Sequence, residues 1–311
     1  MRLVFMATGE IAEPSFAAAI SSEHEVAGLV TQPDRPAGRK QVLTAPKVKE
    51  MAVAEEIPVI QPEKVGEEGA LQQIRDWDPE VIVVMAYGQI LPQALIDIPR
   101  KAIINLHASL LPKYRGASCV QGPIREGDES TGWSVIHVVQ KLDAGNIILQ
   151  DKLRIRGQET GGELHDRLAG SAPAALREAL ALLEKVECAG EAQDESRVSY
   201  VSKLLREDGR IDWRQSAAQI ERLIRAYHPW PGTFTEFAGR RLKIFPQTKL
   251  GRGSGQPGAL LKNAENRLEI ACGNGSLFLE TVQPDGKGQM DAESFLRGYG
   301  DQLEGGFSRG K

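Results

Sequence analysis

Val81-Ile82-Val83-Val84-Met85-Ala86 is a run of six apolar residues, four of which are β-branched. Such a run is typical of a strand that is buried on both faces of a sheet. Three further runs share this character: Leu3–Ala7, Val26–Thr31 and Ala102–Leu106. Between them, Pro46–Glu55 and Ala70–Trp77 have the apolar spacing of helices. This alternation predicts an α/β fold built on a doubly wound, mostly parallel sheet.

The pattern continues into the middle of the chain. Ser134–Val139 and Ile147–Ile155 resemble further strands, and a helix is expected from about Glu163 to Lys185. The stretch that follows is polar and has no clear periodicity, so we predict a linker at residues 189–205. A chain of 311 residues also exceeds what one hydrophobic core usually fills, which favours two domains.

The composition changes in the last third of the chain. A helix near Ser216–Tyr227 is followed by short strand-like runs separated by Gly, Pro and Asn. These runs are Thr233–Phe237, Arg241–Phe245, Gly258–Leu261, Leu268–Ala271 and Leu277–Val282. Their spacing predicts a small β-barrel. We therefore expect a first domain at residues 1–188 and a second at residues 206–311.

Charge is unevenly distributed between the two parts. Residues 206–311 hold 16 basic and 13 acidic residues, a net of +3, whereas the whole chain has a net charge of −4. A polyanion could be gripped locally by the second part, although ordinary variation in surface charge explains the counts equally well. The three cysteines favour a reducing compartment, and no apolar stretch is long enough for a signal peptide or a membrane span. We therefore expect a cytoplasmic protein without a membrane partner, and a monomer.

Two common site types lack their sequence signatures. The turn after the first strand, Ala7–Ala12, does not contain the glycine pattern of dinucleotide-binding folds, and no Walker A motif occurs. The histidines show no metal-ligand spacing, so we expect no metal. The chemistry must therefore come from other polar groups, since this fold class carries many different activities.

The stretch Ile103-Ile104-Asn105-Leu106-His107-Ala108-Ser109 places two polar side chains at the end of a buried strand. Asn105 and His107 are two residues apart and share one face, and Asp143 follows in a turn about 36 residues later. An amide, an imidazole and a carboxylate suit the attack of an amine on a carbonyl carbon, which creates an oxyanion and releases a proton. An ordinary turn and a capping aspartate remain the alternative interpretation.

The segment Asn105–Pro112, with Leu142-Asp143-x-Gly145 downstream, resembles the signature of the transferases that use 10-formyltetrahydrofolate. The resemblance implies a Rossmann-like formyltransferase domain in which Asn105, His107 and Asp143 carry out formyl transfer. It also implies 10-formyltetrahydrofolate as co-substrate. The folate site would be lined by residues of two segments: Ser109, Leu110, Leu111 and Pro112, and Met85, Tyr87, Gly88, Ile90 and Leu91.

Two more segments resemble those family members that formylate initiator methionyl-tRNA. Gln32–Lys40 is similar to their basic insertion loop, and Asp208–Trp213 with Ile224–Gly232 is similar to the start of their OB-like C-terminal domain. The resemblance implies initiator methionyl-tRNA as partner, with phosphate contacts from six cations: Arg35, Arg39, Lys40, Arg240, Arg241 and Lys243.

Some positions depart from the family pattern. Ala7-Thr8-Gly9 stands where Gly-Thr-Pro is usual, Lys40 replaces a glycine, and His228 stands where asparagine is common. Two other activities remain open at this stage. One is formyl transfer to a sugar-nucleotide amine, and the other is RNA binding without catalysis.

Overall fold

The computed structural model describes residues 1–38, 41–185, 188–263, 265, 267–303 and 306–307. The chain divides into two compact units, which are considered separately. The first unit contains Met1–Cys119, Thr131–Leu153 and His165–Val201. The second contains Val120–Ser130, Arg154–Leu164 and Ser202–Lys311.

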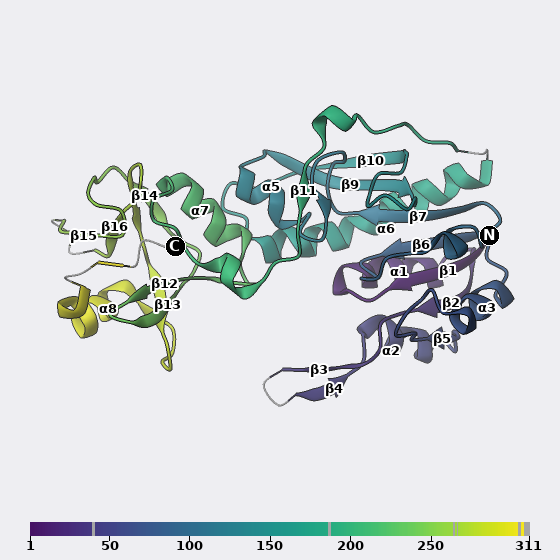
Figure 1. The fold of residues 1–311 in the computed structure, drawn as a ribbon, viewed down its shortest axis with the longest axis horizontal. Coiled ribbons are helices and arrows are strands. Elements are labelled where there is room, and N and C mark those ends of the chain that lie inside the picture. The colour runs from purple at the N-terminus through teal and green to yellow at the C-terminus, as the bar shows by residue number, and fades with distance from the viewer. Residues whose placement is uncertain (39–40, 186–187, 264, 266, 304–305, 308–311) are drawn as a thin grey trace. The chain divides into compact units, whose positions relative to one another are not determined.

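A seven-stranded sheet forms the centre of the first unit (Figure 1). Its order is β10-β9-β7-β6-β1-β2-β5, and the five strands from β7 to β5 are parallel, whereas β9 runs antiparallel to β7. The strands are β1 (Arg2–Ala7), β2 (Glu25–Val30), β5 (Val59–Ile60), β6 (Val81–Met85), β7 (Ala102–His107), β9 (Ser130–His137) and β10 (Ile147–Arg154). The predicted mostly parallel, doubly wound sheet is confirmed.

Helices cover both faces of this sheet. On β1, Val4 and Met6 belong to the same apolar cluster as Leu71 and Ile74 of α3. Phe5 lies between them in sequence and therefore faces the other way, where its ring packs 5.2 Å from that of Phe16 in α1. The helices are α1 (Glu13–Ile20), α2 (Lys47–Ala54), α3 (Glu68–Asp76), α4 (Gln93–Ile96) and α6 (Gly161–Lys185).

The sequence missed several short elements of the first unit. Helix α1 has only 8 residues and contains three consecutive alanines, so its apolar spacing is weak. The other missed elements are η1 (Glu10–Ala12), β3 (Arg35–Ala37), β4 (Val42–Thr44), β5 (Val59–Ile60), α4 (Gln93–Ile96), β8 (Arg115–Gly116), η2 (Glu195–Arg197) and β11 (Tyr200–Val201). Strands β3 and β4 form an antiparallel hairpin, and β11 pairs in parallel with β8.

Two antiparallel four-stranded sheets share one core in the second unit, which confirms the predicted small β domain. Their orders are β12-β13-β18-β19 and β14-β17-β16-β15. The strands are β12 (Thr233–Phe237), β13 (Arg240–Ile244), β14 (Lys249–Gly251), β15 (Leu260–Leu261), β16 (Glu269–Ala271), β17 (Ser276–Phe278), β18 (Thr281–Pro284) and β19 (Met290–Asp291). The helices are α5 (Gln121–Glu126), η3 (Arg206–Gly209), α7 (Ala217–Ala226), α8 (Ala292–Tyr299) and η4 (Gly300–Leu303).

One predicted strand of the second unit is wrong. Leu277–Val282 was expected as a single strand, but Leu279 and Glu280 separate β17 from β18, which belong to different sheets. The side chains of Leu277, Leu279 and Val282 are all buried in one core, so the apolar pattern runs through the break.

In the part of the chain that the structure describes, no helix combines the length and apolarity that crossing a membrane requires.

Candidate active site

The chain proceeds from β1 to β2 and β5 on one side and from β6 to β7 on the other, so the topological switch point of the sheet lies between β1 and β6. In folds of this class, ligands bind at the carboxyl ends of the parallel strands beside this point. The segments that leave these two strands are bonded to each other. Gly9 N donates to Ala86 O at 3.2 Å, and Thr8 Oγ1 donates to Tyr87 O at 3.2 Å. Strand β7 lies beside β6 and ends at the same edge of the sheet. The polar residues that end β7 therefore lie where ligands bind in folds of this class.

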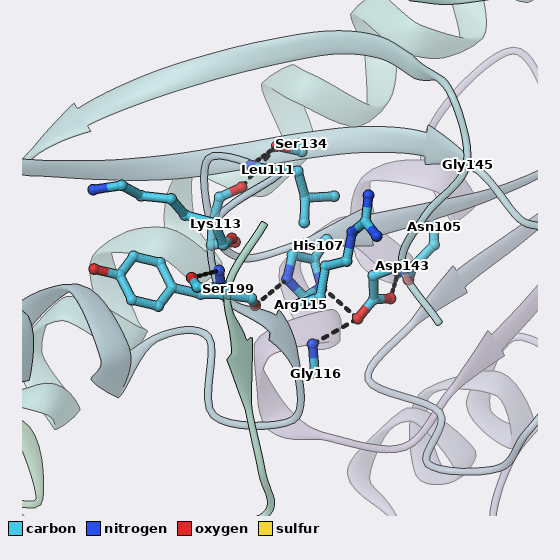
Figure 2. A network of polar contacts seen from close by, with 12 residues as sticks. Asn105, His107, Leu111, Lys113, Arg115, Gly116, Ser134, Asp143, Gly145 and Ser199 are labelled. Atoms are coloured by element: carbon cyan, nitrogen blue, oxygen red, sulfur yellow. Dashed lines mark hydrogen bonds and ion pairs between the residues drawn. The ribbon is translucent and has the colours of Figure 1, made fainter. Parts of the chain in front are cut away.

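The structure brings the three predicted catalytic residues together (Figure 2). Asn105 and His107 are on β7, and Asp143 lies in the turn between β9 and β10. Asn105 Nδ2 donates to Asp143 Oδ1 at 3.5 Å, and His107 Nδ1 lies 3.7 Å from Asp143 Oδ2. Both distances are at or beyond the outer limit for a hydrogen bond, so each group keeps capacity to bind a substrate atom.

A backbone carbonyl determines which nitrogen of His107 carries a hydrogen. His107 Nε2 is 2.9 Å from Tyr114 O, and a carbonyl oxygen can only accept. Nε2 therefore holds a hydrogen, and Nδ1 is the ring nitrogen that faces Asp143 and can exchange a proton. The side chain of His107 is buried, so this bond is protected from competition with water.

The Asp143 carboxylate is held by a backbone amide. Gly116 N donates to Asp143 Oδ2 at 2.8 Å. The backbone of Asp143 has a φ of 48°, in the left-handed region that few non-glycine residues adopt, although aspartate tolerates it better than most. Two positions later, a Cβ on Gly145 would lie 1.7 Å from His137 O, so only glycine fits there. The turn therefore fixes the place of its carboxylate.

The predicted folate segment Ser109–Pro112 follows directly after His107 and is anchored by its neighbours. Ser109 is fully buried, and its Oγ donates to Lys113 O at 2.8 Å. Ser134 Oγ, on β9, accepts from Leu111 N at 2.9 Å and donates to Ser109 O at 2.7 Å. Leu111 is buried, whereas Leu110 and Pro112 are partly exposed. The segment is thus a rigid wall beside the polar trio.

The second predicted folate segment divides into buried and exposed residues. Met85 and Tyr87 have side chains in the core, and burial raises the pKa of the Tyr87 hydroxyl. They can serve a ligand through backbone groups. Gly88 and Ile90 are exposed, Ile90 to 90%, and Leu91 is partly buried. An isoleucine exposed to this degree is available for apolar contact with a ligand.

The predicted basic loop, Gln32–Lys40, contains β3, and further cations follow it through β4 and the start of α2. Arg35 lies on β3 with an exposed side chain, and its Nη2 is 4.0 Å from a carboxylate oxygen of Glu63. Arg39 and Lys40 lie outside the described residues. Two further cations of this stretch are paired: Lys47 Nζ is 2.6 Å from Glu50 and Lys49 Nζ is 2.8 Å from Asp34. Acids next to the stretch thus offset part of its charge.

The three basic residues predicted on the second unit differ in their surroundings. Arg241 pairs with Glu207 at 2.9 Å, and its guanidinium lies 3.8 Å from the centre of the Phe234 ring. Arg240 and Lys243 are exposed, and neither side chain is paired with an acid within the described part of the chain. Arg241 therefore has a structural partner, while the other two are available to bind an anion.

Sequence reasoning missed the groups that support the trio. They are the Tyr114 carbonyl, the Gly116 amide and the side chains of Arg115 and Gln193. Residues 188–201, here called the connecting segment, supply Gln193, and all but Cys188 lie in the stretch predicted as a linker, residues 189–205. The stretch Lys113-Tyr114-Arg115-Gly116 directly follows the predicted signature and was assigned no role. Backbone groups leave no trace in side-chain patterns, and nothing in the polar composition of the connecting segment marks Gln193.

The arrangement holds the kinds of group that proton transfer and oxyanion binding require. An amide donor, an imidazole nitrogen and a carboxylate point at one region, and the neighbouring wall is apolar. Among the residues whose positions are described, no group of three His, Cys, Asp or Glu side chains is arranged to hold a metal ion.

Comparison with known proteins shows the family to which the chain belongs. Residues 1–180 match the family model described as formyl transferase, and residues 203–300 match the model described as formyl transferase, C-terminal domain. The fold, the site and these matches define a formyl transferase.

A methionyl-tRNA formyltransferase of Akkermansia muciniphila is 48% identical over 305 residues, which cover 96% of this chain and 97% of that protein. A second, from Pseudomonas putida, is 43% identical over 288 residues, covering 92% and 93%. The chain belongs to the methionyl-tRNA formyltransferase family. Among solved structures, the sugar 3N-formyl transferase WlaRD shares the fold, with a TM-score of 0.68 at 17% identity over 92% of this chain and 98% of that one.

We predict that Glu195→Gln destabilises the protein in a pH-dependent way. Hydrogen bonds from Arg115 and Lys141 lower the pKa of the Glu195 carboxyl from 4.5 to about 2. A lowered pKa means that the ion pair stabilises the fold fully above pH 4.5 and loses its effect as the pH falls toward 2. Urea unfolding at pH 7, 4 and 3 measures the free energy of unfolding. The difference in this free energy between wild type and variant should become smaller as the pH falls. A constant difference would contradict this origin.

Proposed function

We propose that this protein transfers the formyl group of 10-formyltetrahydrofolate to the α-amino group of initiator methionyl-tRNA, giving formylmethionyl-tRNA and tetrahydrofolate. The observation that carries the proposal is the meeting of Asn105, His107 and Asp143 at the end of β7. These groups match the needs of amide formation from an amine, and the substrate supplies its own nucleophile.

In the proposed reaction the amine nitrogen attacks the formyl carbon, and the carbonyl oxygen gains negative charge. Asn105 Nδ2 donates to this oxygen, and His107 Nδ1 donates as well when the ring carries a hydrogen on both nitrogens, a contribution of about 3 kcal/mol per donor. Asp143 accepts the proton that leaves the amine, directly or through water, and keeps His107 in place. The intermediate collapses when the bond to N10 of the folate breaks, and N10 takes up a proton.

The acceptor is inferred from relatives and from the second unit. The relatives that match along nearly the whole chain carry the name methionyl-tRNA formyltransferase, whereas the sugar-modifying enzyme shares the fold at only 17% identity. Arg240 and Lys243 offer exposed positive charge on β13. Residues 206–311 would then form the part that grips tRNA, and Arg35, Arg39 and Lys40 would meet the acceptor end.

The deciding experiment offers two acceptors to the purified protein with 10-formyltetrahydrofolate. We expect formylated methionyl-tRNA and no product from an aminodeoxy sugar nucleotide. Formylation of the sugar with unchanged methionyl-tRNA would overturn the proposed acceptor, and no product from either would overturn the proposed activity.

Single alanine substitutions at Asn105, His107 and Asp143 should each lower kcat by about 10²–10³-fold, the usual effect of losing an oxyanion donor or catalytic base. His165→Ala is the matched control, because His165 lies on helix α6 with a partly exposed side chain that is 3.1 Å from Asp166 and has no contact with the trio among the described hydrogen bonds. It should keep the wild-type kcat. Thermal unfolding would check that all four variants are folded. Wild-type rates in the three site variants would remove the mechanism.

The double variant Arg240→Ala/Lys243→Ala should weaken tRNA binding without changing kcat. Each lost phosphate contact reduces the slope of log affinity against log salt by about 1. The measurement is KM for methionyl-tRNA at several salt concentrations. Arg241→Ala is the contrasting variant, because Arg241 is paired with Glu207, so it should lower stability more than the salt slope. An unchanged slope in the double variant would exclude these two cations from the tRNA contact.

A further inference from the structure

The connecting segment lies along the active-site side of the first unit and is bonded to it at both ends. At its start, His137 Nε2 is 2.6 Å from Cys188 O, and Ile147 and Glu191 exchange two backbone hydrogen bonds of 2.7 and 2.8 Å. At its end, β11 pairs with β8, the strand that contains Arg115 and supplies the Gly116 amide to Asp143. The segment therefore contacts both chain stretches that hold the Asp143 carboxylate.

Gln193 is the residue of this segment that reaches the catalytic turn. Its Nε2 donates to Asp143 O and to Gly145 O, each at 2.8 Å. Its Oε1 accepts from Arg115 Nε at 3.1 Å and from Arg115 Nη2 at 2.8 Å. Both hydrogens and both lone pairs of the amide are used. In the reverse orientation the amide oxygen would face the carbonyl oxygens of Asp143 and Gly145, and the amide hydrogens would face the guanidinium hydrogens of Arg115. Both contacts would be repulsive, so the amide has one possible orientation.

Arg115 fixes Gln193 in turn. Its side chain is fully buried, and Glu195, two residues beyond Gln193, accepts from its Nη2 at 2.8 Å. A buried guanidinium must keep its acceptors, because an unpaired charge in the interior costs several kcal/mol. Arg115, Gln193 and Glu195 thus form a chain of charge-assisted contacts that ends on the backbone around Asp143.

We propose that Gln193 is a positioning residue for Asp143, acting through the carbonyls on either side of the turn rather than through the substrate. This inference rests on the proposed catalytic role of Asp143. The turn has a left-handed residue at Asp143, and Gln193 ties together the two carbonyls that enclose Ala144. Without this tie the carboxylate keeps the Gly116 bond but loses the fixed backbone behind it.

The test uses two substitutions that separate the two halves of the amide. Gln193→Met keeps the length and removes all four bonds, whereas Gln193→Glu keeps an acceptor for Arg115 but cannot donate to the two carbonyls. Both should lower kcat about 10- to 100-fold, the effect of displacing a catalytic group by about 1 Å, with KM for both substrates within about three-fold of wild type. Ser196→Ala, on the same segment and bonded only to Asp194 in the described contacts, should behave as wild type.

A double-mutant cycle distinguishes positioning from general support of the fold. In an Asp143→Asn background, Gln193→Met should cost less than about two-fold in kcat, because its effect passes through the Asp143 carboxylate. An equal cost in both backgrounds, or a wild-type kcat for Gln193→Glu, would overturn the proposal. If Asp143→Asn has no measurable rate, the cycle cannot be completed, and the kcat of Gln193→Glu alone tests the proposal. A wild-type kcat for Asp143→Asn would instead count against the proposed mechanism itself.

Discussion

The hydrogen bond from the Gly116 amide to the Asp143 carboxylate joins the two stretches of chain on which the site depends. One stretch follows β7 and carries His107, whose ring is oriented by the Tyr114 carbonyl two residues before Gly116. The other is the turn between β9 and β10. The bond from Gly116 N to Asp143 Oδ2 is 2.8 Å long, whereas Asp143 lies 3.5 Å from Asn105 and 3.7 Å from His107. The backbone amide therefore holds the carboxylate more closely than the two catalytic side chains do. A site of this kind is preorganised, and its reactive groups still have room for substrate.

Backbone groups orient several of the side chains around this site. The Tyr114 carbonyl sets the tautomer of His107, and the carbonyls of Asp143 and Gly145 accept from Gln193. Backbone groups on a packed sheet are fixed in place, so they orient side chains without the entropy cost of ordering another long side chain. Arg115 differs, because it supports the site through a charged side chain. Its guanidinium is buried and therefore needs the carboxylate of Glu195 as a partner.

The sequence predicted the sheet well because strands such as β6 and β7 are apolar on both faces, which leaves few alternatives. It also named Asn105, His107 and Asp143, which the structure places together. It failed where the signal is short or long-range. Helix α1 is brief and rich in alanine, and the pairing of β11 with β8 joins residues about 85 positions apart. The contact between Gln193 and Asp143 spans 50 positions and involves a backbone carbonyl, so no local pattern reveals it.

The connecting segment also has a consequence for chain length. Two of its attachments, the Gln193 amide and strand β11, are separated by residues 194–199, which include the single turn η2. Removing or adding one residue there would shift one attachment by up to about 3.5 Å, more than a hydrogen bond tolerates. Exposed polar stretches usually accept insertions and deletions freely. Apart from Glu195, which pairs with Arg115, this stretch is expected to tolerate changes in residue type better than changes in residue number.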